Sequence, residues 1–257
     1  MKRIIPVLLV HEGGLVKSIK FKNYNYVGDP INAVKIFNEK GVDEIVILDI
    51  AATKKKQSPD LSLIKEIASE AFMPLAYGGG ITSIDQVKDI LYQGVEKVVF
   101  NNSALLTPRL IEETAHRFGS SSTVVSVDVK SNLFGRQYVY SDSGKVNAKL
   151  DVVEYVKNME KLGAGEIFLN SVDRDGTYKG YDLALIKMVS AAVSIPVVAC
   201  GGAKDESDLI DAINIGGASA SAAGSLFVYK GVHRAVLINY PDWEDIQSKI
   251  SIKDGRS

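Results

Sequence analysis

Pro74-Leu-Ala-Tyr-Gly-Gly-Gly-Ile81 and Pro196-Val-Val-Ala-Cys-Gly-Gly-Ala203 carry one pattern twice, 122 residues apart. Each stretch begins with proline, continues as a short apolar run and ends in paired glycines. The same spacing relates Gly41 to Gly163, Glu44 to Glu166, Ile45 to Ile167, Gly94 to Gly216, and Ser103 to Ser225. Because these matches fall at the ends of apolar runs and at helix-ending glycines, they indicate a chain of two equivalent halves.

Short apolar runs alternate with segments of helical period along the whole chain. The runs begin near Ile4, Ile45, Met73, Val98, Thr123, Ile167, Pro196 and Ala218. The helical segments include 30–41, 60–71, 84–94, 108–118, 151–163, 182–193 and 206–216. Strands that alternate with helices pair in parallel, and eight of them close a barrel. An open doubly wound sheet would not require two equivalent halves, so the sequence predicts a (β/α)8 TIM barrel with a two-fold internal repeat.

One barrel accommodates the full length of the chain, 257 residues. We expect a single domain over 1–257, with half-repeats at about 1–122 and 123–240 and a final packing helix after 241, around Trp243. The net charge of -1 gives no electrostatic reason to expect nucleic acid or a membrane surface as partner. No apolar stretch reaches the length of a membrane helix, and one cysteine allows no internal disulfide, so we expect a cytoplasmic protein.

Glycines and small polar residues follow the third, fourth, seventh and eighth predicted strands. In a barrel of this kind, the loops after the strands build the active site. Glycine lets backbone N–H groups approach an anion closely, and the loops after the last two strands are the usual phosphate site. The repeat adds a second such site on the opposite side. We therefore expect a phosphorylated small-molecule ligand with two phosphates, although glycines of this kind also serve tight turns.

Six motifs resemble a known family: Lys2-Arg-Ile-Ile5, Gly28-Asp-Pro30, Asp43-Glu-Ile-Val-Ile-Leu-Asp49, Gly78-Gly-Gly-Ile81, Ser171-Val-Asp-Arg-Asp-Gly-Thr177 and Gly180-Tyr-Asp182. They are similar to the cyclase subunit of imidazole glycerol phosphate synthase over nearly the whole chain. The resemblance implies a lyase or amidotransferase-type synthase subunit, in a heterodimer with a glutaminase that supplies ammonia through the barrel. It also implies one phosphate site at Gly80, Asn101 and Asn102, and another at Asp175, Gly176, Gly202, Gly224 and Ser225.

Charged residues stand at the starts of four predicted strands. Side chains alternate along a strand, so one set faces the barrel lumen. This parity places Arg3, Glu44, Lys97 and Glu166 inward at the bottom of the barrel. Their charges match the ammonia gate that the resemblance implies, and the alternative is an ion-pair plug with a structural role.

The expected catalytic pair is incomplete. The family has two aspartates on the first and fifth strands as general acid and base, and here Asp128 is retained whereas Leu9 stands in the first position. Leucine cannot transfer a proton, and each positioned acid or base contributes about a hundredfold to ten-thousandfold. Lys17 follows in the loop after the first strand and is expected to close over a phosphate. The catalytic candidates are therefore Asp128 and Lys17.

The first strand and its loop, Leu8-Leu-Val10 followed by Gly13-Gly-Leu-Val-Lys17, resemble a branch linked to acetamidino sugars of bacterial surface polysaccharides. Such a subunit is expected to supply ammonia to a sugar amidotransferase. Three alternatives stay open. They are the histidine-pathway cyclase itself, a catalytically reduced barrel that serves as scaffold and activates the glutaminase, and an isomerase of the related ribonucleotide-aminoimidazole type.

The remaining candidates are weaker. His11, His116 and His233 have no metal-ligand spacing, so we expect neither a metal nor a cofactor, and only His11 could face the mouth. Cys200 is expected to be a small buried residue. The lysines of 54–56 are expected to be solvated.

Overall fold

The computed structural model describes residues 2–132, 134–231 and 233–250. Its central strands are β1 (Arg3–His11), β4 (Ile45–Asp49), β5 (Leu75–Gly78), β6 (Lys97–Phe100), β7 (Thr123–Ser131), β10 (Glu166–Ser171), β11 (Val197–Cys200) and β12 (Ala220–Ala223). They pair in parallel in this order, and β12 returns to pair with β1, which closes the sheet into a barrel. The predicted (β/α)8 TIM barrel is confirmed, and each predicted strand start lies within two residues of the observed one.

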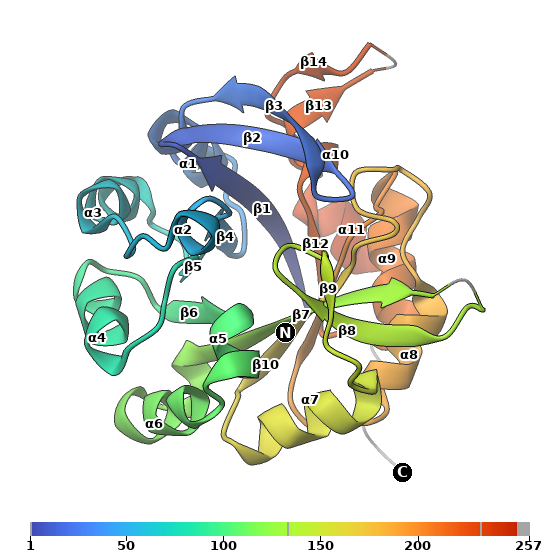
Figure 1. Ribbon diagram of the computed structural model, residues 1–257. Coiled ribbons are helices and arrows are strands. Elements are labelled where there is room, and N and C mark those ends of the chain that lie inside the picture. The colour runs from blue at the N-terminus through green and yellow to red at the C-terminus, as the bar shows by residue number, and fades with distance from the viewer. Residues whose placement is uncertain (1, 133, 232, 251–257) are drawn as a thin grey trace.

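Helices surround the strands (Figure 1). They are α1 (Pro30–Glu39), α3 (Leu61–Glu70), α4 (Ile84–Tyr92), α6 (Arg109–Phe118), α7 (Val152–Lys161), α8 (Leu183–Ser190), α9 (Glu206–Asn214) and α11 (Trp243–Lys249). Most begin after an aspartate or serine whose side chain accepts a backbone N–H of the first turn, as Asp151 does for α7. The helix expected after residue 241 is α11, and residues 251–257 lie outside the described part.

Alternation along the strands divides the core into two. Ile5 and Val7 of β1 belong to a cluster that fills the lumen, whereas Ile4 and Leu8 pack outward against the helices. The other buried apolar residues of the lumen are Val46, Ala76, Val99, Val124, Phe168, Val198, Cys200, Ala220 and Ala222. This division is the one that strand parity predicts.

Several further elements lie beyond the carboxyl ends of the strands, and the sequence did not predict them. They are β2 (Gly14–Ile19), β3 (Lys22–Gly28), α2 (Ala52–Lys55), α5 (Asn102–Leu106), β8 (Gln137–Ser141), β9 (Val146–Asn147), α10 (Ser225–Val228), β13 (Tyr229–Lys230) and β14 (Ala235–Val236). The expectation that Lys17 lies in a loop is wrong, because it belongs to β2. Glu12 and Gly13 both have positive φ, which makes a two-residue turn and folds β2 back onto β1.

Phe37, a buried residue of α1, gives a test of the packing between the helices and the barrel. Phe37 is 0% exposed, whereas Phe72, after α3, is 82% exposed. Phe37→Ala should lower the free energy of unfolding by about 3–5 kcal/mol, because it leaves a cavity between helix and barrel. Phe72→Ala should change it by no more than about 0.5 kcal/mol. Urea denaturation of both variants measures the difference, and equal losses would contradict the packing described here.

Candidate functional site

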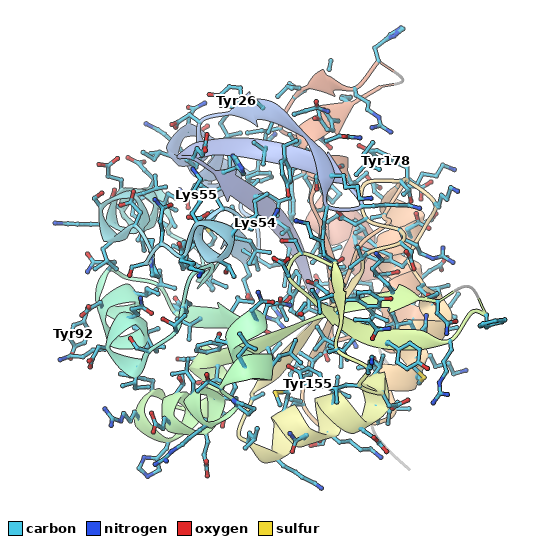
Figure 2. The ribbon with its side chains drawn as sticks, viewed as in Figure 1. Tyr26, Lys54, Lys55, Tyr92, Tyr155 and Tyr178 are labelled. Atoms are coloured by element: carbon cyan, nitrogen blue, oxygen red, sulfur yellow. The ribbon has the colours of Figure 1, made fainter. Side chains whose placement is uncertain are left out.

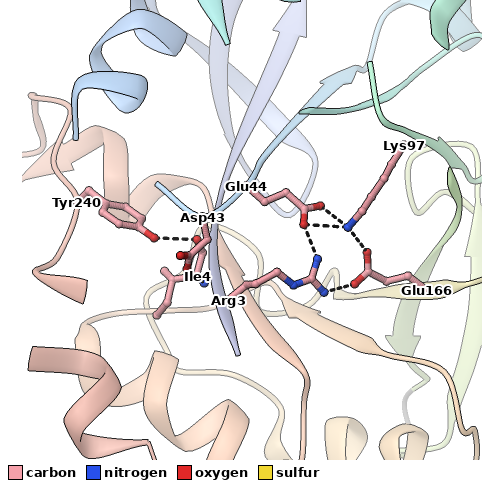
Figure 3. Close-up of polar contacts among 7 residues, drawn as sticks. All are labelled: Arg3, Ile4, Asp43, Glu44, Lys97, Glu166 and Tyr240. Atoms are coloured by element: carbon pink, nitrogen blue, oxygen red, sulfur yellow. Dashed lines mark hydrogen bonds and ion pairs between the residues drawn. The ribbon is translucent and has the colours of Figure 1, made fainter. Parts of the chain in front are cut away.

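Four charged side chains meet at the amino-terminal end of the lumen (Figure 3). Arg3, Lys97 and Glu166 begin β1, β6 and β10, and Glu44 immediately precedes β4. Lys97 Nζ lies 2.8 Å from a Glu44 oxygen and 3.0 Å from a Glu166 oxygen, and the Arg3 guanidinium pairs with the same two carboxylates. The structure thus brings these four predicted residues into a ring in which each charge contacts two of the opposite sign.

The strand that carries Arg3 is held in place beside this ring. The backbone N–H of Ile4 donates to the Asp43 carboxylate at 2.9 Å, and the Tyr240 hydroxyl donates to the Ile4 carbonyl oxygen at 2.9 Å. Figure 3 shows Tyr240 and Asp43 beside this end of β1. Burial raises the pKa of Asp43, and the Ile4 N–H opposes that effect. A residue just before α11 therefore fixes the position of the first strand.

The opposite end of the barrel opens into a cavity of about 490 Å³. The predicted site residues that line it are Lys17, Gly80, Asn101, Asn102, Asp128, Asp175, Gly224 and Ser225. Gly176 and Gly202 do not belong to the lining. A Cβ atom at Gly176 would lie 2.3 Å from the Ser18 carbonyl oxygen, so the hairpin of β2 and β3 packs directly on this loop.

Asp128 lies within reach of two amides at the mouth. Asn101 Nδ2 is 3.3 Å from one carboxylate oxygen of Asp128, and Asn170 Nδ2 is 3.5 Å from the other. Burial and the nearby Asp175 raise the pKa of Asp128 to about 7, and the two amides oppose the shift. The carboxyl group can therefore hold or release a proton near neutral pH. Asn101 was expected at a phosphate site, and nothing in the sequence indicated that it or Asn170 contacts Asp128.

Lys17 extends from β2 into the base of the mouth. Its Nζ donates to the Val7 carbonyl oxygen at 2.6 Å, and a Cβ atom at Gly224 would lie 2.7 Å from it. Burial lowers the pKa of Lys17 to about 8, whereas Asp175 raises it. Burial in turn raises the pKa of Asp175 to about 6, and Lys17 lowers it. Lys17, with a lowered pKa, and Asp175, with a raised pKa, thus share the mouth with Asp128.

Leu9 lines the same cavity from β1. β1 and β7 lie four strands apart in a barrel of eight, so Leu9 and Asp128 occupy opposite walls. The sequence of β1, RIIPVLLVH, contains no carboxylate. Any proton transfer that needs a carboxyl group on β1 itself therefore lacks it here.

The hairpin of β2 and β3 contacts α2 through aromatic and basic side chains. Tyr24 stacks on His11 with ring centroids 5.2 Å apart, and Lys54 Nζ donates to the Tyr24 hydroxyl at 2.9 Å. Figure 2 shows Lys54 and Lys55 on α2, below this hairpin. His11 therefore packs under the hairpin and does not line the mouth. The lysines of 54–56 are exposed, as expected.

The remaining sequence candidates contribute little to the site. Cys200 is a buried free cysteine, as expected, and burial raises the pKa of its thiol. Among the described residues, no cluster of three or more histidines, cysteines, aspartates or glutamates could hold a metal ion. No helix in that same part of the chain is long and apolar enough to span a bilayer.

Comparison with known proteins adds to this geometry. The family model described as "Histidine biosynthesis protein" matches residues 3–234. A Pseudomonas aeruginosa protein named "Putative imidazole glycerol phosphate synthase subunit hisF2" is 50% identical over 241 residues, which cover 94% of this chain and 96% of that protein. The chain belongs to the HisF family. "Imidazole glycerol phosphate synthase subunit HisF" of Alkaliphilus metalliredigens is 42% identical and covers 90% of this chain and 92% of its own length.

A further relative supports the same placement. "Putative imidazole glycerol phosphate synthase subunit HisF" of Leptospira interrogans is 47% identical over 95% of this chain and 96% of that protein. The resemblance to cyclase subunits that the sequence motifs indicated is therefore confirmed at the level of the HisF family. The numbered subunit name of the Pseudomonas relative also marks a paralogue among these proteins.

Removing one cation from the ring of this HisF-family chain should cost much more than removing an exposed one. Lys97→Gln leaves Glu44 and Glu166 with Arg3 alone, and loss of one partner from a buried ion pair costs about 3–5 kcal/mol. Lys55→Gln breaks a pair with Glu12 whose side chains are 44% and 59% exposed, so it should leave the free energy of unfolding nearly unchanged. Chemical denaturation at pH 7 checks both, and a ring variant as stable as the control would show that the ring carries little stability.

Asp128→Asn should stabilise the protein in a pH-dependent way. The pKa of Asp128 is raised in the folded state, so ionisation above pH 4 opposes folding until the folded-state pKa near 7 is passed. The stabilising effect of the neutral amide should therefore grow from about pH 4 to about pH 7 and stay constant above, with an upper bound of about 4 kcal/mol. Thermal unfolding of both proteins at pH 5 and pH 8 measures this, and a difference that does not grow with pH would contradict it.

Proposed function

We propose that this chain is an ammonia-channelling synthase subunit that pairs with a glutaminase and supplies ammonia for amidination of a bacterial surface sugar. The observation that carries the proposal is Leu9 on the wall opposite Asp128, because it removes one of the two carboxylates of the family's cyclisation step. The change does not affect the residues of the proposed ammonia route, which are the charged ring and the apolar lumen.

The route begins at the ring of Arg3, Glu44, Lys97 and Glu166. Relatives are named as subunits of imidazole glycerol phosphate synthase, which supports a glutaminase docked over this end as the second subunit of a heterodimer. Beyond the ring, the lumen is lined by apolar side chains such as Val46 and Val99. Neutral ammonia crosses such a lining more readily than ammonium does, because burying an unpaired charge is costly. The ring therefore acts as the gate of the proposed channel.

The mouth would hold the phosphorylated ligand. Gly80, Asn101 and Asn102 lie on one side. The proposed site on the other side comprises Asp175, Gly224 and Ser225, which line the cavity, together with Gly176 and Gly202, which do not. The Asn101 amide donates to Asp128 and to the Ser126 carbonyl oxygen, so its backbone is the part left for a phosphate. Lys17 supplies a buried positive charge beside Gly224.

The chemistry proposed on this chain is limited to Asp128 and Lys17. Asp128, with a pKa near 7, can give or take one proton, and Lys17 can stabilise negative charge. Without a carboxylate on β1, the chain binds a phosphorylated compound and delivers ammonia, and a sugar amidotransferase receives it.

The closest alternative is the histidine-pathway cyclase itself. It is favoured by the 42% identity to a protein named as the HisF subunit and by the presence of Asp128 and Lys17. A barrel that has lost its chemistry and only activates the glutaminase is a third reading, also consistent with Leu9. An isomerase of the ribonucleotide-aminoimidazole type needs two acidic groups, so Leu9 disfavours it equally.

An assay with the authentic cyclase substrate and free ammonium separates these functions. The wild-type chain should turn over at least about a hundredfold more slowly than a family cyclase, because one positioned acid or base is missing. Leu9→Asp should raise that rate by restoring a carboxylate opposite Asp128, and Leu9→Asn is the matched control, similar in size and without a carboxylate. Product formation is followed by absorbance or chromatography.

Turnover by the wild-type chain at the rate of a family cyclase, abolished in Asp128→Asn, would overturn the proposal. One carboxylate would then suffice, and the chain would act as the histidine-pathway cyclase. Binding of the substrate without turnover agrees with the proposal, since phosphate binding is separable from proton transfer.

A further inference from the structure

A second cavity, of about 250 Å³, adjoins the mouth between the β2–β3 hairpin and the segment of β13 and β14. Its lining residues are Lys17, Ser18, Ile19, Asn25, Ser225, Tyr229 and Arg234. Lys17, Ser18 and Ser225 also line the mouth, so the two cavities share a wall at the proposed phosphate site. A single water needs about 10–15 Å³, so the space beyond Ser225 accommodates a group of several atoms.

The charge of this cavity is positive. Arg234 and Lys17 contribute cations, and none of the described residues that line it is an aspartate or glutamate. The Arg234 guanidinium carbon lies 4.9 Å from the centroid of the Tyr178 ring. Figure 2 shows Tyr178 in the loop after β10, on the side of the β13–β14 hairpin. The stack therefore holds the guanidinium at the cavity that Ser225 also lines.

The donors of Arg234 are available for a ligand. The ion pairs among the described residues do not include Arg234. No carboxylate in that part of the chain therefore pairs with its guanidinium group. A guanidinium binds phosphate through two parallel N–H donors, which gives both energy and geometry.

A buried hydroxyl gives an independent indication of a ligand. Ser18 is 5% exposed, and its Oγ makes no hydrogen bond within the described structure. Buried polar atoms without a partner are rare, because each costs about 1–3 kcal/mol. Ser18 lines both cavities, so its hydroxyl lies where a ligand that spans them would pass.

We propose that this second cavity binds a phosphoryl group bonded to the phosphate at Ser225, so that the ligand is an organic diphosphate at this end. The inference rests on the phosphate site of the proposed function and specifies the class of compound that enters it. Ser225 and Lys17 contact the inner phosphoryl group, the Arg234 fork contacts the outer one, and Ser18 donates between them.

Titration calorimetry of the full chain with inorganic phosphate and with pyrophosphate, in metal-free buffer, tests the proposal. The wild-type chain should bind pyrophosphate about tenfold more tightly than phosphate, since a charged hydrogen-bonded pair is added. Arg234→Gln should reduce that preference to about twofold and leave phosphate binding unchanged. Arg136→Gln is the matched control, because Arg136 stacks on Tyr138 in the same way, 5.3 Å from its centroid, and lines neither cavity.

The outcomes separate the two proposals. Phosphate binding without a preference for pyrophosphate would overturn the diphosphate inference and leave the phosphate site intact. Equal loss of preference in Arg234→Gln and Arg136→Gln would also overturn it, because general charge would then explain the effect. Binding of neither anion would contradict the phosphate site itself. Thermal melting of each variant verifies the fold, and Ser18→Ala, expected to weaken pyrophosphate binding selectively, gives a second measurement.

Discussion

In a closed barrel of eight strands, side chains along every strand alternate between the lumen and the surrounding helices, and the site depends on this constraint. Once the β1–β12 and β7–β10 pairs are formed, every second side chain must enter the lumen. Charged side chains at the strand starts therefore converge at the amino-terminal end of the lumen. Apolar side chains meet in the middle of the lumen, and polar side chains reach the mouth. A ring of paired ions, an apolar lumen and a polar mouth follow along one axis from this single condition.

The sequence was informative wherever a periodic pattern determined the structure. The strands, the helices and the inward position of Arg3, Glu44, Lys97 and Glu166 follow from runs of alternating residues and from strand parity. The hairpin of β2 and β3 could not be deduced in the same way, because its sequence lies between two strong patterns and its turn depends on a positive φ at Glu12. Contacts between distant segments, such as Arg234 with Tyr178, leave no local signal in the chain.

The mouth differs from a simple polar cleft in its balance of charge. Burial raises the pKa of both Asp128 and Asp175, Asp175 raises that of Asp128 further, and Lys17 lowers that of Asp175. The amides of Asn101 and Asn170 add neutral donors on Asp128 without adding charge. A site with these features responds to a bound anion, because the anion would favour the protonated form of each carboxyl group and the charged form of the lysine.

The pairing of β1 with β12 also determines when the molecule can be assembled. During synthesis β1 leaves the ribosome long before its neighbour at 220–223, and Tyr240 follows later still. Until then β1 has an unpaired edge, which is where nascent chains associate wrongly. A chain released before residue 220 would contain Arg3, Glu44, Lys97 and Glu166 without the closed wall that sets their spacing. The ring at the amino-terminal end of the lumen therefore forms only after residues 220–223 have been made, although Arg3 is synthesised far earlier.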